Sequence, residues 1–418
     1  MKIQALSNLY PPNVVGGYEE LCFHVMQNLV ERGHQVTVLT SNYGDRHASY
    51  PGQKIIRTLK LLAAPENIYA PFMADATERD AINRKNIDVL KEALSIERPD
   101  IVFIWNLHFL APSFLRAIEQ ANEPSVYLLT DNWLAVFHNP DFVADYFARQ
   151  VQAPAGGIMR FLKSQVRQLL WRQKQQRKIA GLALFPSRFM QALYQQAGLG
   201  FERYAIVHHG ILPSASALSI TGDRNRLING EELRLLVAGR MVEIKGVHTA
   251  IEAMPQITRA FPQLRVRLKI VGDDRDKAYK EKILELIRAL KMDEQVSFVP
   301  PVHEALLPQL FQQSDIYLFP SLYEPFSLTL IHALRSGIPT VASKAGGTPE
   351  IVRHGRTGML FDPADAGDLA RQVICLVKNP VLRERVSQQA RDCASQFTFE
   401  KMVDHVEAHL LSTYQGQS

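Results

Sequence analysis

The pattern that most constrains the fold of this chain is an alternation of short β-branched runs with helical stretches, which occurs twice. In the N-terminal half, strand-like runs such as Lys2–Leu6 and Val36–Leu39 flank a stretch with apolar residues at helical spacing. After residue 232 the alternation restarts at Leu233–Val237 and continues to Thr340–Ala342. Alternation of this kind is typical of parallel sheets covered by helices on both faces. The sequence therefore predicts an α/β fold with two doubly wound, Rossmann-like sheets.

A polar segment at residues 210–232, rich in Ser, Gly and Asn, separates the two halves and reads as a linker. We expect an N-terminal domain at 1–209, a second domain at 233–395, and a C-terminal helix at 396–418 that crosses back toward the first domain. Two large domains agree with a length of 418 residues. Since doubly wound sheets bind ligands beyond the carboxyl ends of their strands, the default site is a cleft between the domains.

Composition excludes several classes of protein. Apolar residues make up 46% of the chain and charged residues 21%, which argues against wholesale disorder. No apolar run approaches the ~18–20 residues of a spanning helix, and the N-terminus has no secretory pattern. The three scattered cysteines argue against a disulfide framework or a cysteine metal site. We expect a cytoplasmic protein.

The loop that follows Leu233–Val237 carries two basic residues. Arg240 comes directly after Gly239, and Lys245 lies five residues further on, just before the next helix. An arginine offers a planar fork for phosphate oxygens, and a lysine offers a point charge. The pattern favours a phosphate site, although a solvated basic loop would look the same.

A second informative loop runs through Glu324, Pro325, Phe326, Ser327 and Leu328. Pro325 closes the turn, and the amide groups of the three residues after it are expected to be the unpaired donors of the first helical turn. A helix N-terminus of this kind binds anions. Glu324 would repel a phosphate unless it serves a neutral part of the same ligand, such as sugar hydroxyls. The combination suggests a nucleotide sugar.

Two further loops are candidates for ligand contacts. Gly16 and Gly17 precede the first helix and would allow a close approach of the backbone. Val302, with Pro300 and Pro301, follows the strand at Val296–Val299 and could offer main-chain groups to a nucleotide base. Both signals are weak alone and gain weight from their place beyond strand ends.

Together these motifs resemble those of family-4 glycosyltransferases with the GT-B fold. The matching pieces are Gly239-Arg240 with Lys245-Gly246, Ile270-Val271-Gly272-Asp273, Pro320 to Leu328, Gly346 to Val352, and more loosely Gly16-Gly17 and Pro186-Ser187-Arg188-Phe189. The resemblance implies transfer of a hexose, commonly glucose, from a nucleoside diphosphate sugar to a sugar or lipid-linked glycan, with retention. Family usage favours UDP over GDP. No cofactor and no metal ion are expected beyond the donor itself.

The resemblance also implies roles for single residues. Arg240 and Lys245 would hold the diphosphate and stabilise the leaving group. Glu324 matches the first acid of the family's E-x7-E pattern, expected near the hydroxyls of the donor sugar. The position of the second acid is occupied by His332. An imidazole makes one hydrogen bond to the ribose where a carboxylate makes two, so a weaker ribose contact is expected.

The N-terminal half departs from the family at a second place. In the segment Leu129–Leu134, the position of a family histidine is Thr130, whereas Asp131 is kept and Asn132 follows it. A histidine base is therefore excluded there. Asp131 could orient the acceptor or the donor sugar, and His108 is another candidate, although it could equally be a satisfied histidine at a strand end.

Nine Lys or Arg residues and no Asp or Glu lie between Tyr146 and Phe201, in a chain whose formal net charge is +5. Within the basic segment 149–188, apolar and basic residues fall on opposite faces of a predicted helix. Such a helix could lie on the anionic inner-membrane surface. The alternatives are an ordinary surface helix and an acidic acceptor. Nucleic acid is not expected, because aromatic residues are not interleaved at stacking intervals.

Two other functions remain compatible with the sequence. A sugar-nucleotide epimerase of the same fold would release an altered nucleotide sugar without any acceptor. A non-catalytic nucleotide-sugar binding protein is conceivable because of His332 and Thr130, although Arg240, Lys245 and Glu324 argue for catalysis. The sequence leaves the acceptor, the linkage and the oligomeric state open.

Overall fold

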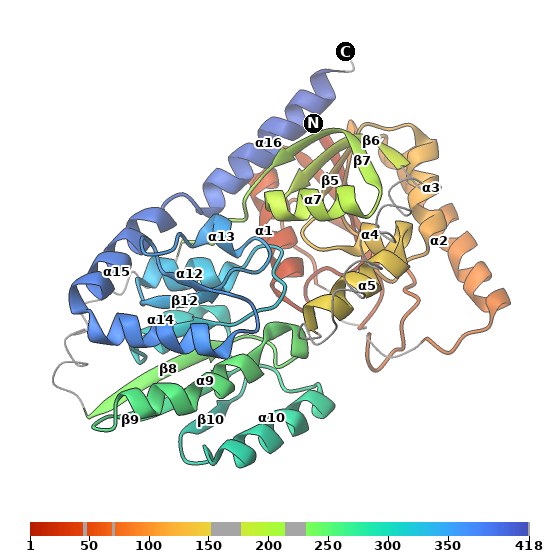
Figure 1. Ribbon diagram of the computed structural model, residues 1–418. Helices are drawn as coiled ribbons and strands as arrows, with labels where there is room; N and C mark the ends of the chain where they lie inside the picture. The colour runs from red at the N-terminus through yellow and green to blue at the C-terminus, as the bar shows by residue number, and fades with distance from the viewer. Residues whose placement is uncertain (45–47, 69–71, 152–176, 214–230, 417–418) are drawn as a thin grey trace. The chain divides into compact units, whose positions relative to one another are not determined.

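The computed structural model describes residues 1–44, 48–68, 72–151, 177–213 and 231–416, and these residues form two compact units (Figure 1). The first unit comprises the described parts of Met1–Tyr146, Gly156–Val207 and Met402–Ser418. The second comprises those of Phe147–Ala155 and His208–Lys401. Most of the predicted linker and of the predicted basic helix lies outside the described residues.

The first unit is built on a seven-stranded parallel sheet with the strand order β3-β2-β1-β4-β5-β6-β7. The strands are β1 (Lys2–Ser7), β2 (Gln35–Ser41), β3 (Gln53–Leu59), β4 (Ile101–Asn106), β5 (Ser125–Leu128), β6 (Arg177–Phe185) and β7 (Leu199–Ile206). All six residues of β4 are buried, as expected for a central strand with helices on both faces.

The helices of this unit are α1 (Gly17–Glu31), α2 (Ala76–Glu97), α3 (Pro112–Ala121), α4 (Trp133–His138), α5 (Pro140–Val151) up to Tyr146, α7 (Arg188–Gln196) and most of α16 (Phe399–Gln415). Ion pairs tie α16 to the turn before β2. Arg32 contacts Asp404 at 2.7 Å and Glu407 at 2.6 Å, and His34 contacts Glu407 at 2.8 Å. The C-terminal helix is thus part of the first unit, although it is last in the sequence.

The second unit is built on a six-stranded parallel sheet with the order β10-β9-β8-β11-β12-β13. Its strands are β8 (Glu232–Ala238), β9 (Arg265–Val271), β10 (Val296–Val299), β11 (Ile316–Phe319), β12 (Thr340–Ser343) and β13 (Met359–Phe361). Its helices are η1 (Glu243–Lys245), α9 (Val247–Ala260), α10 (Lys277–Leu290), η2 (Glu304–Leu306), α11 (Leu307–Gln312), α12 (Leu328–Ser336), α13 (Thr348–Ile351), α14 (Ala366–Lys378) and α15 (Pro380–Ala394).

Alternation along β8 divides the core of this unit into two layers. Leu233, Leu235 and Val237 pack with α9, α10 and α14 on one face of the sheet. Leu236 and Ala238 pack with α11, α12 and part of α15 on the other face, where Figure 1 shows α12 beside α15. The two layers confirm the doubly wound sheet that the sequence predicts.

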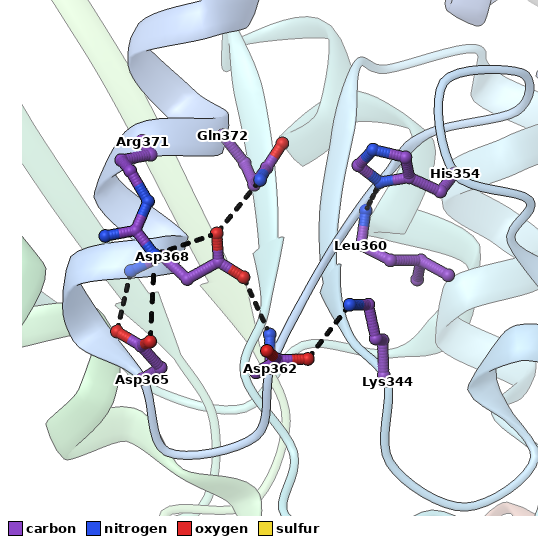
Figure 2. A network of polar contacts seen from close by, with 8 residues as sticks. All are labelled: Lys344, His354, Leu360, Asp362, Asp365, Asp368, Arg371 and Gln372. Atoms are coloured by element: carbon purple, nitrogen blue, oxygen red, sulfur yellow. Dashed lines mark hydrogen bonds and ion pairs between the residues drawn. The ribbon is translucent and has the colours of Figure 1, made fainter.

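Figure 2 shows a polar network that ties the edge strand β13 to α14. Asp365 caps α14 by accepting from the amide of Asp368, and Asp368 accepts from the amide of Asp362 at 2.9 Å. Lys344 donates to Asp362 at 2.9 Å. Because Lys344 begins the loop after β12, the network anchors one end of that loop.

Both sheets reverse their strand order at one place, between β1 and β4 and between β8 and β11. The loops that leave the carboxyl ends of two such strands diverge to opposite faces of the sheet, and ligands bind in the space that this opens. The expected sites therefore lie beyond β8 and β11 in the second unit and beyond β1 and β4 in the first.

Candidate functional site

The loops after β8 and β11 contact each other closely in the second unit. The amide of Leu322 donates to the carbonyl of Ile244 at 2.8 Å. Gly246 has φ +65°, and a Cβ there would lie 2.1 Å from the carbonyl oxygen of Pro320. Only glycine combines this backbone conformation with this approach. Gly246 therefore fixes the position of Lys245 relative to the loop that carries Glu324.

The ammonium of Lys245 and the carboxylate of Glu324 form an ion pair, with 2.6 Å between Nζ and Oε2. The Glu324 side chain is 9% exposed and that of Lys245 is 22% exposed. The fold thus brings together two predicted residues that are 79 positions apart. Arg240 and Gly239, also predicted, are exposed at the start of the Lys245 loop.

The loop after β12 supports Glu324 from the other side. The amide of Gly347 donates to the carbonyl of Glu324 at 2.8 Å. Gly346 has φ +59°, and a Cβ there would lie 2.1 Å from the same carbonyl oxygen. The main chain of Glu324 is therefore packed against a loop that the Lys344–Asp362 contact anchors.

The helix after Glu324 begins later than the sequence analysis predicts. The Oγ of Ser327 accepts from the amide of Leu330 at 3.2 Å, so Ser327 is the N-cap and Leu328 is the first helical residue. Phe326 and Pro325 precede the helix, and the amide of Phe326 does not belong to its first turn. The physical reason is that a serine hydroxyl satisfies a first-turn amide, whereas Phe326 has no side-chain acceptor. The amides of Leu328 and Thr329 remain the first-turn donors of α12.

Phe326 instead contributes its ring to an aromatic cluster. His208 stacks on it with 4.9 Å between ring centroids, and the rings of His209 and Phe397 lie at 5.7 and 5.8 Å. His209 is buried, and no described residue is a hydrogen-bond partner of its Nε2. The cluster packs the segment just before α12 against a buried imidazole.

Acidification should destabilise the second unit through His209. Burial lowers the pKa of this imidazole to about 3, with a smaller contribution from His208, whereas an unperturbed histidine titrates near 6.5. Below pH 6.5 the unfolded chain binds a proton that the folded chain does not. The free energy of unfolding should therefore decrease as the pH is lowered, by about 1 to 2 kcal/mol between pH 6.5 and 5. Urea denaturation at the two pH values measures this change.

The variant His209→Leu should lose this part of the pH dependence, because leucine does not titrate. The exposed His405 provides a control, because His405→Leu also removes a histidine but should keep the acid sensitivity that the buried His209 causes. An unchanged slope in His209→Leu would show that other groups account for the acid sensitivity.

His332 lies in the second turn of α12 and is buried, with 4% of its side chain exposed. Its Nε2 contacts the Oε1 of Glu304 at 2.6 Å, and its Nδ1 contacts the Nη2 of Arg335 at 3.2 Å. Val302, the predicted base contact, lies in the loop after β10 and is half-buried, two residues before Glu304. Glu304 is not among the residues that the sequence predicts for the site.

In the first unit, the predicted glycines lie at the start of α1. Gly16 is the N-cap with an extended backbone, and Gly17 is the first helical residue. The carboxylate of Glu19 accepts from the amides of Gly16 at 2.9 Å and Val15 at 3.4 Å. Burial raises the pKa of Glu19. Glu19 was not predicted, although its spacing from Gly16 is that of a capping box.

Asp131 lies beyond β5 and is held by several donors. Its carboxylate accepts from the amide of Trp133 at 3.0 Å and from Asn106 at 3.3 Å, and its carbonyl accepts from Tyr194 at 2.8 Å. Burial raises the pKa of Asp131, and the charge of His108 acts in the opposite direction. The carboxylate is therefore held between the end of β4 and the start of α4.

His108 follows β4, and its amide donates to Asn106 at 2.8 Å. Burial lowers the pKa of His108, and the charge of Asp131 opposes that shift. Thr130 is buried beside Asp131, and Asn132 is half-buried as the residue before α4. The predicted acceptor-side residues thus gather beyond β4 and β5, with Asn106 as an addition that sequence reasoning missed.

The described residues contain no group of three or more His, Cys, Asp or Glu that could hold a metal ion. In the same part of the chain, no helix is long and apolar enough to cross a membrane.

Two family models match the chain. Residues 15–214 match the model described as Glycosyltransferase Family 4, and residues 221–392 match Glycosyl transferases group 1. An uncharacterized glycosyltransferase of Methanocaldococcus jannaschii is 24% identical over 403 residues, which cover 94% of this chain and 93% of that protein.

Solved structures with the same fold cover nearly all of the chain. Sucrose-phosphate synthase of Thermosynechococcus elongatus superposes with a TM-score of 0.72 at 19% identity and covers 100% of both chains. The Anabaena protein HepE, solved in complex with UDP and glucose, has a TM-score of 0.64 at 20% identity and covers 99% of this chain and 100% of its own.

Proposed function

Because this chain belongs to the family-4 glycosyltransferases with the GT-B fold, we propose that it transfers a hexose, glucose in the first instance, from a UDP-sugar to a glycan or lipid-linked acceptor with retention of configuration. That it is a glycosyltransferase with a sugar-nucleotide donor follows from the family. The choice of UDP and glucose is supported by the HepE complex, although that likeness in itself concerns only the fold.

The observation that carries the proposal is the Lys245–Glu324 ion pair. It lies at the switch point of the second sheet, where the strand order reverses between β8 and β11. A donor diphosphate carries negative charge, and its sugar carries hydroxyls, so one ligand needs both a cation and a carboxylate side by side. The amino end of α12 begins at Leu328, four residues after Glu324, and adds first-turn amides for phosphate oxygens. These three features match the two chemically different parts of a nucleotide sugar.

In the proposed reaction, Lys245 and Arg240 stabilise the charge that develops on the leaving nucleoside diphosphate. Glu324 accepts hydrogen bonds from the donor sugar. The leaving phosphate takes the proton of the acceptor hydroxyl on the same face of the sugar, so that the configuration is retained. Asp131, with His108 near it, orients the acceptor hydroxyl. We propose that no metal ion is required, because the cationic side chains and α12 supply the charge.

The acceptor side of the proposal rests on the first unit and on the basic segment 149–188. The positive charge of that segment suits an acceptor presented at an anionic membrane surface. Most of the segment lies outside the described residues, so this part of the proposal depends on the sequence.

Isothermal titration with UDP and GDP tests the donor site, and micromolar binding of UDP is the expected result. Turnover is then measured over several nucleotide sugars, with and without EDTA, using free glycans and lipid-linked glycans in anionic vesicles as acceptors. We expect a glycosylated product from a UDP-hexose that EDTA does not abolish. Failure to bind either diphosphate would refute the donor site, and release of an altered nucleotide sugar without an acceptor would indicate an epimerase.

A further inference from the structure

Three side chains beside α12 form a hydrogen-bonded row in the second unit: Arg335, His332 and Glu304. Arg335 donates from Nη1 to the carbonyl of Leu212 at 2.6 Å, and its Nη2 lies 3.2 Å from Nδ1 of His332. Nε2 of His332 lies 2.6 Å from Oε1 of Glu304. These hydrogen bonds link α12 to η2, since Glu304 in η2 and His332 in α12 are 28 residues apart in the sequence.

The direction of these hydrogen bonds follows from their chemistry. A guanidinium group can only donate, so Nδ1 of His332 accepts and Nε2 carries the proton that is donated to Glu304. The hydrogen bond from His332 is the main cause that lowers the pKa of Glu304. Glu304 is therefore a carboxylate at neutral pH, oriented by a buried imidazole whose tautomer Arg335 fixes.

The carboxylate remains accessible, since 37% of the Glu304 side chain is exposed whereas only 4% of His332 is. A buried positioning group behind an accessible carboxylate is the arrangement of a side chain oriented to bind something in solvent. A contact that served only to hold η2 against α12 would not need the carboxylate to face outward.

The place of Glu304 identifies what it would bind. His332 is five residues after Ser327, which is ~7.5 Å along the helix from the end that attracts the diphosphate. On the other side, Glu304 follows Val302 in the loop after β10, where the base of the donor is expected. In a nucleotide, the group between the diphosphate and the base is the ribose, and its two hydroxyls are donors that suit a carboxylate.

We propose that Glu304, positioned by His332 and Arg335, accepts hydrogen bonds from the 2′ and 3′ hydroxyls of the donor ribose. This inference rests on the proposed function, and it names the residue that recognises the ribose. The sequence places an imidazole in α12 at this subsite, and the fold brings the carboxylate from a different loop. We expect the contact to distinguish ribonucleotide from deoxyribonucleotide donors.

The test compares dissociation constants for UDP with 2′-deoxy-UDP, and for GDP with 2′-deoxy-GDP, by isothermal titration. The wild type should bind the ribose form about 10-fold more tightly or better, the range expected for a hydrogen bond to a charged group. Glu304→Gln keeps the shape of the side chain but removes its charge, and should reduce the ratio to within about twofold. The control Glu294→Gln changes an exposed carboxylate before β10 and should keep the wild-type ratio.

A relocation variant excludes a purely structural explanation. Glu304→Ala should lose the preference, and Glu304→Ala combined with His332→Glu should restore it to about tenfold, because the carboxylate then comes from α12 itself. The inference is overturned if Glu304→Gln or Glu304→Ala keeps the wild-type ratio, or if the wild type shows no preference. Absence of binding of both ribose forms to the wild type would overturn the proposed function as well.

Discussion

Replacing Lys245 by alanine should lower turnover by about 10²-fold or more, the size of effect seen when a group that stabilises developing charge is removed. Glu324→Gln should have a comparable effect, because it removes the carboxylate expected to bind the donor sugar. Both side chains lie at the switch point of the second sheet and contact each other at 2.6 Å. Steady-state kinetics with saturating UDP-sugar, together with UDP affinity, measures the losses.

The ion pair complicates the single variants, since each leaves a largely buried partner unpaired. Loss of one member of such a pair destabilises the fold through the remaining charge. Lys245→Ala with Glu324→Gln removes both charges, so it should recover part of the stability lost in Lys245→Ala and none of the turnover. Lys282→Ala, in an exposed pair with Glu243, should change neither quantity appreciably. Wild-type turnover in both single variants would refute the assignment of the donor site.

Asp131→Asn should lower turnover by about 10²-fold, at the lower end of what a positioned acid or base contributes. The variant removes the negative charge beside His108 and leaves one side-chain oxygen where two now accept, one from Asn106 and one from the amide of Trp133. UDP affinity should stay within about twofold of the wild type, since the residues predicted to bind the diphosphate lie in the second unit. Kinetics with a fixed donor and varied acceptor measures the effect.

Asp141→Asn, at an exposed carboxylate near the start of α5, serves as the matched control and should retain full turnover. Thermal unfolding of Asp131→Asn shows whether a loss of turnover comes from a loss of folded protein. If the folded variant turns over at the wild-type rate, Asp131 has no part in the reaction.

The sequence predicts the central strands of both sheets well, because buried parallel strands are continuous β-branched runs. The strands β3, β7 and β13, which lie at edges of the two sheets, were not predicted, for physical reasons. β3 carries Lys54 and Arg57 beside two adjacent isoleucines and so does not alternate, β7 contains a glycine and the charged residues Glu202 and Arg203, and β13 has only three residues. Such segments become strands because a neighbouring strand offers hydrogen bonds, which no local pattern records.

The candidate site shows the same division. Lys245 and Glu324 could each be selected from the loop in which they lie, but their direct contact depends on close packing at Gly246 and Gly346. Glu304 was not predicted, because the sequence near it suggests only a main-chain contact to the base at Val302 and gives no role to the carboxylate. The role proposed for Glu304 depends on its hydrogen bond with His332, and only the fold places the two side chains within hydrogen-bonding distance.

The position of α16 has a consequence for synthesis of the protein. Its residues from Met402 onward belong to the first unit, where Met402, Val403, Val406 and Leu410 are buried and Arg32 and His34 bind Asp404 and Glu407. On the ribosome, the seven-stranded sheet emerges long before this helix does. The first unit therefore stays incomplete while the second unit is synthesised, and α16 packs against the turn between α1 and β2 only after that.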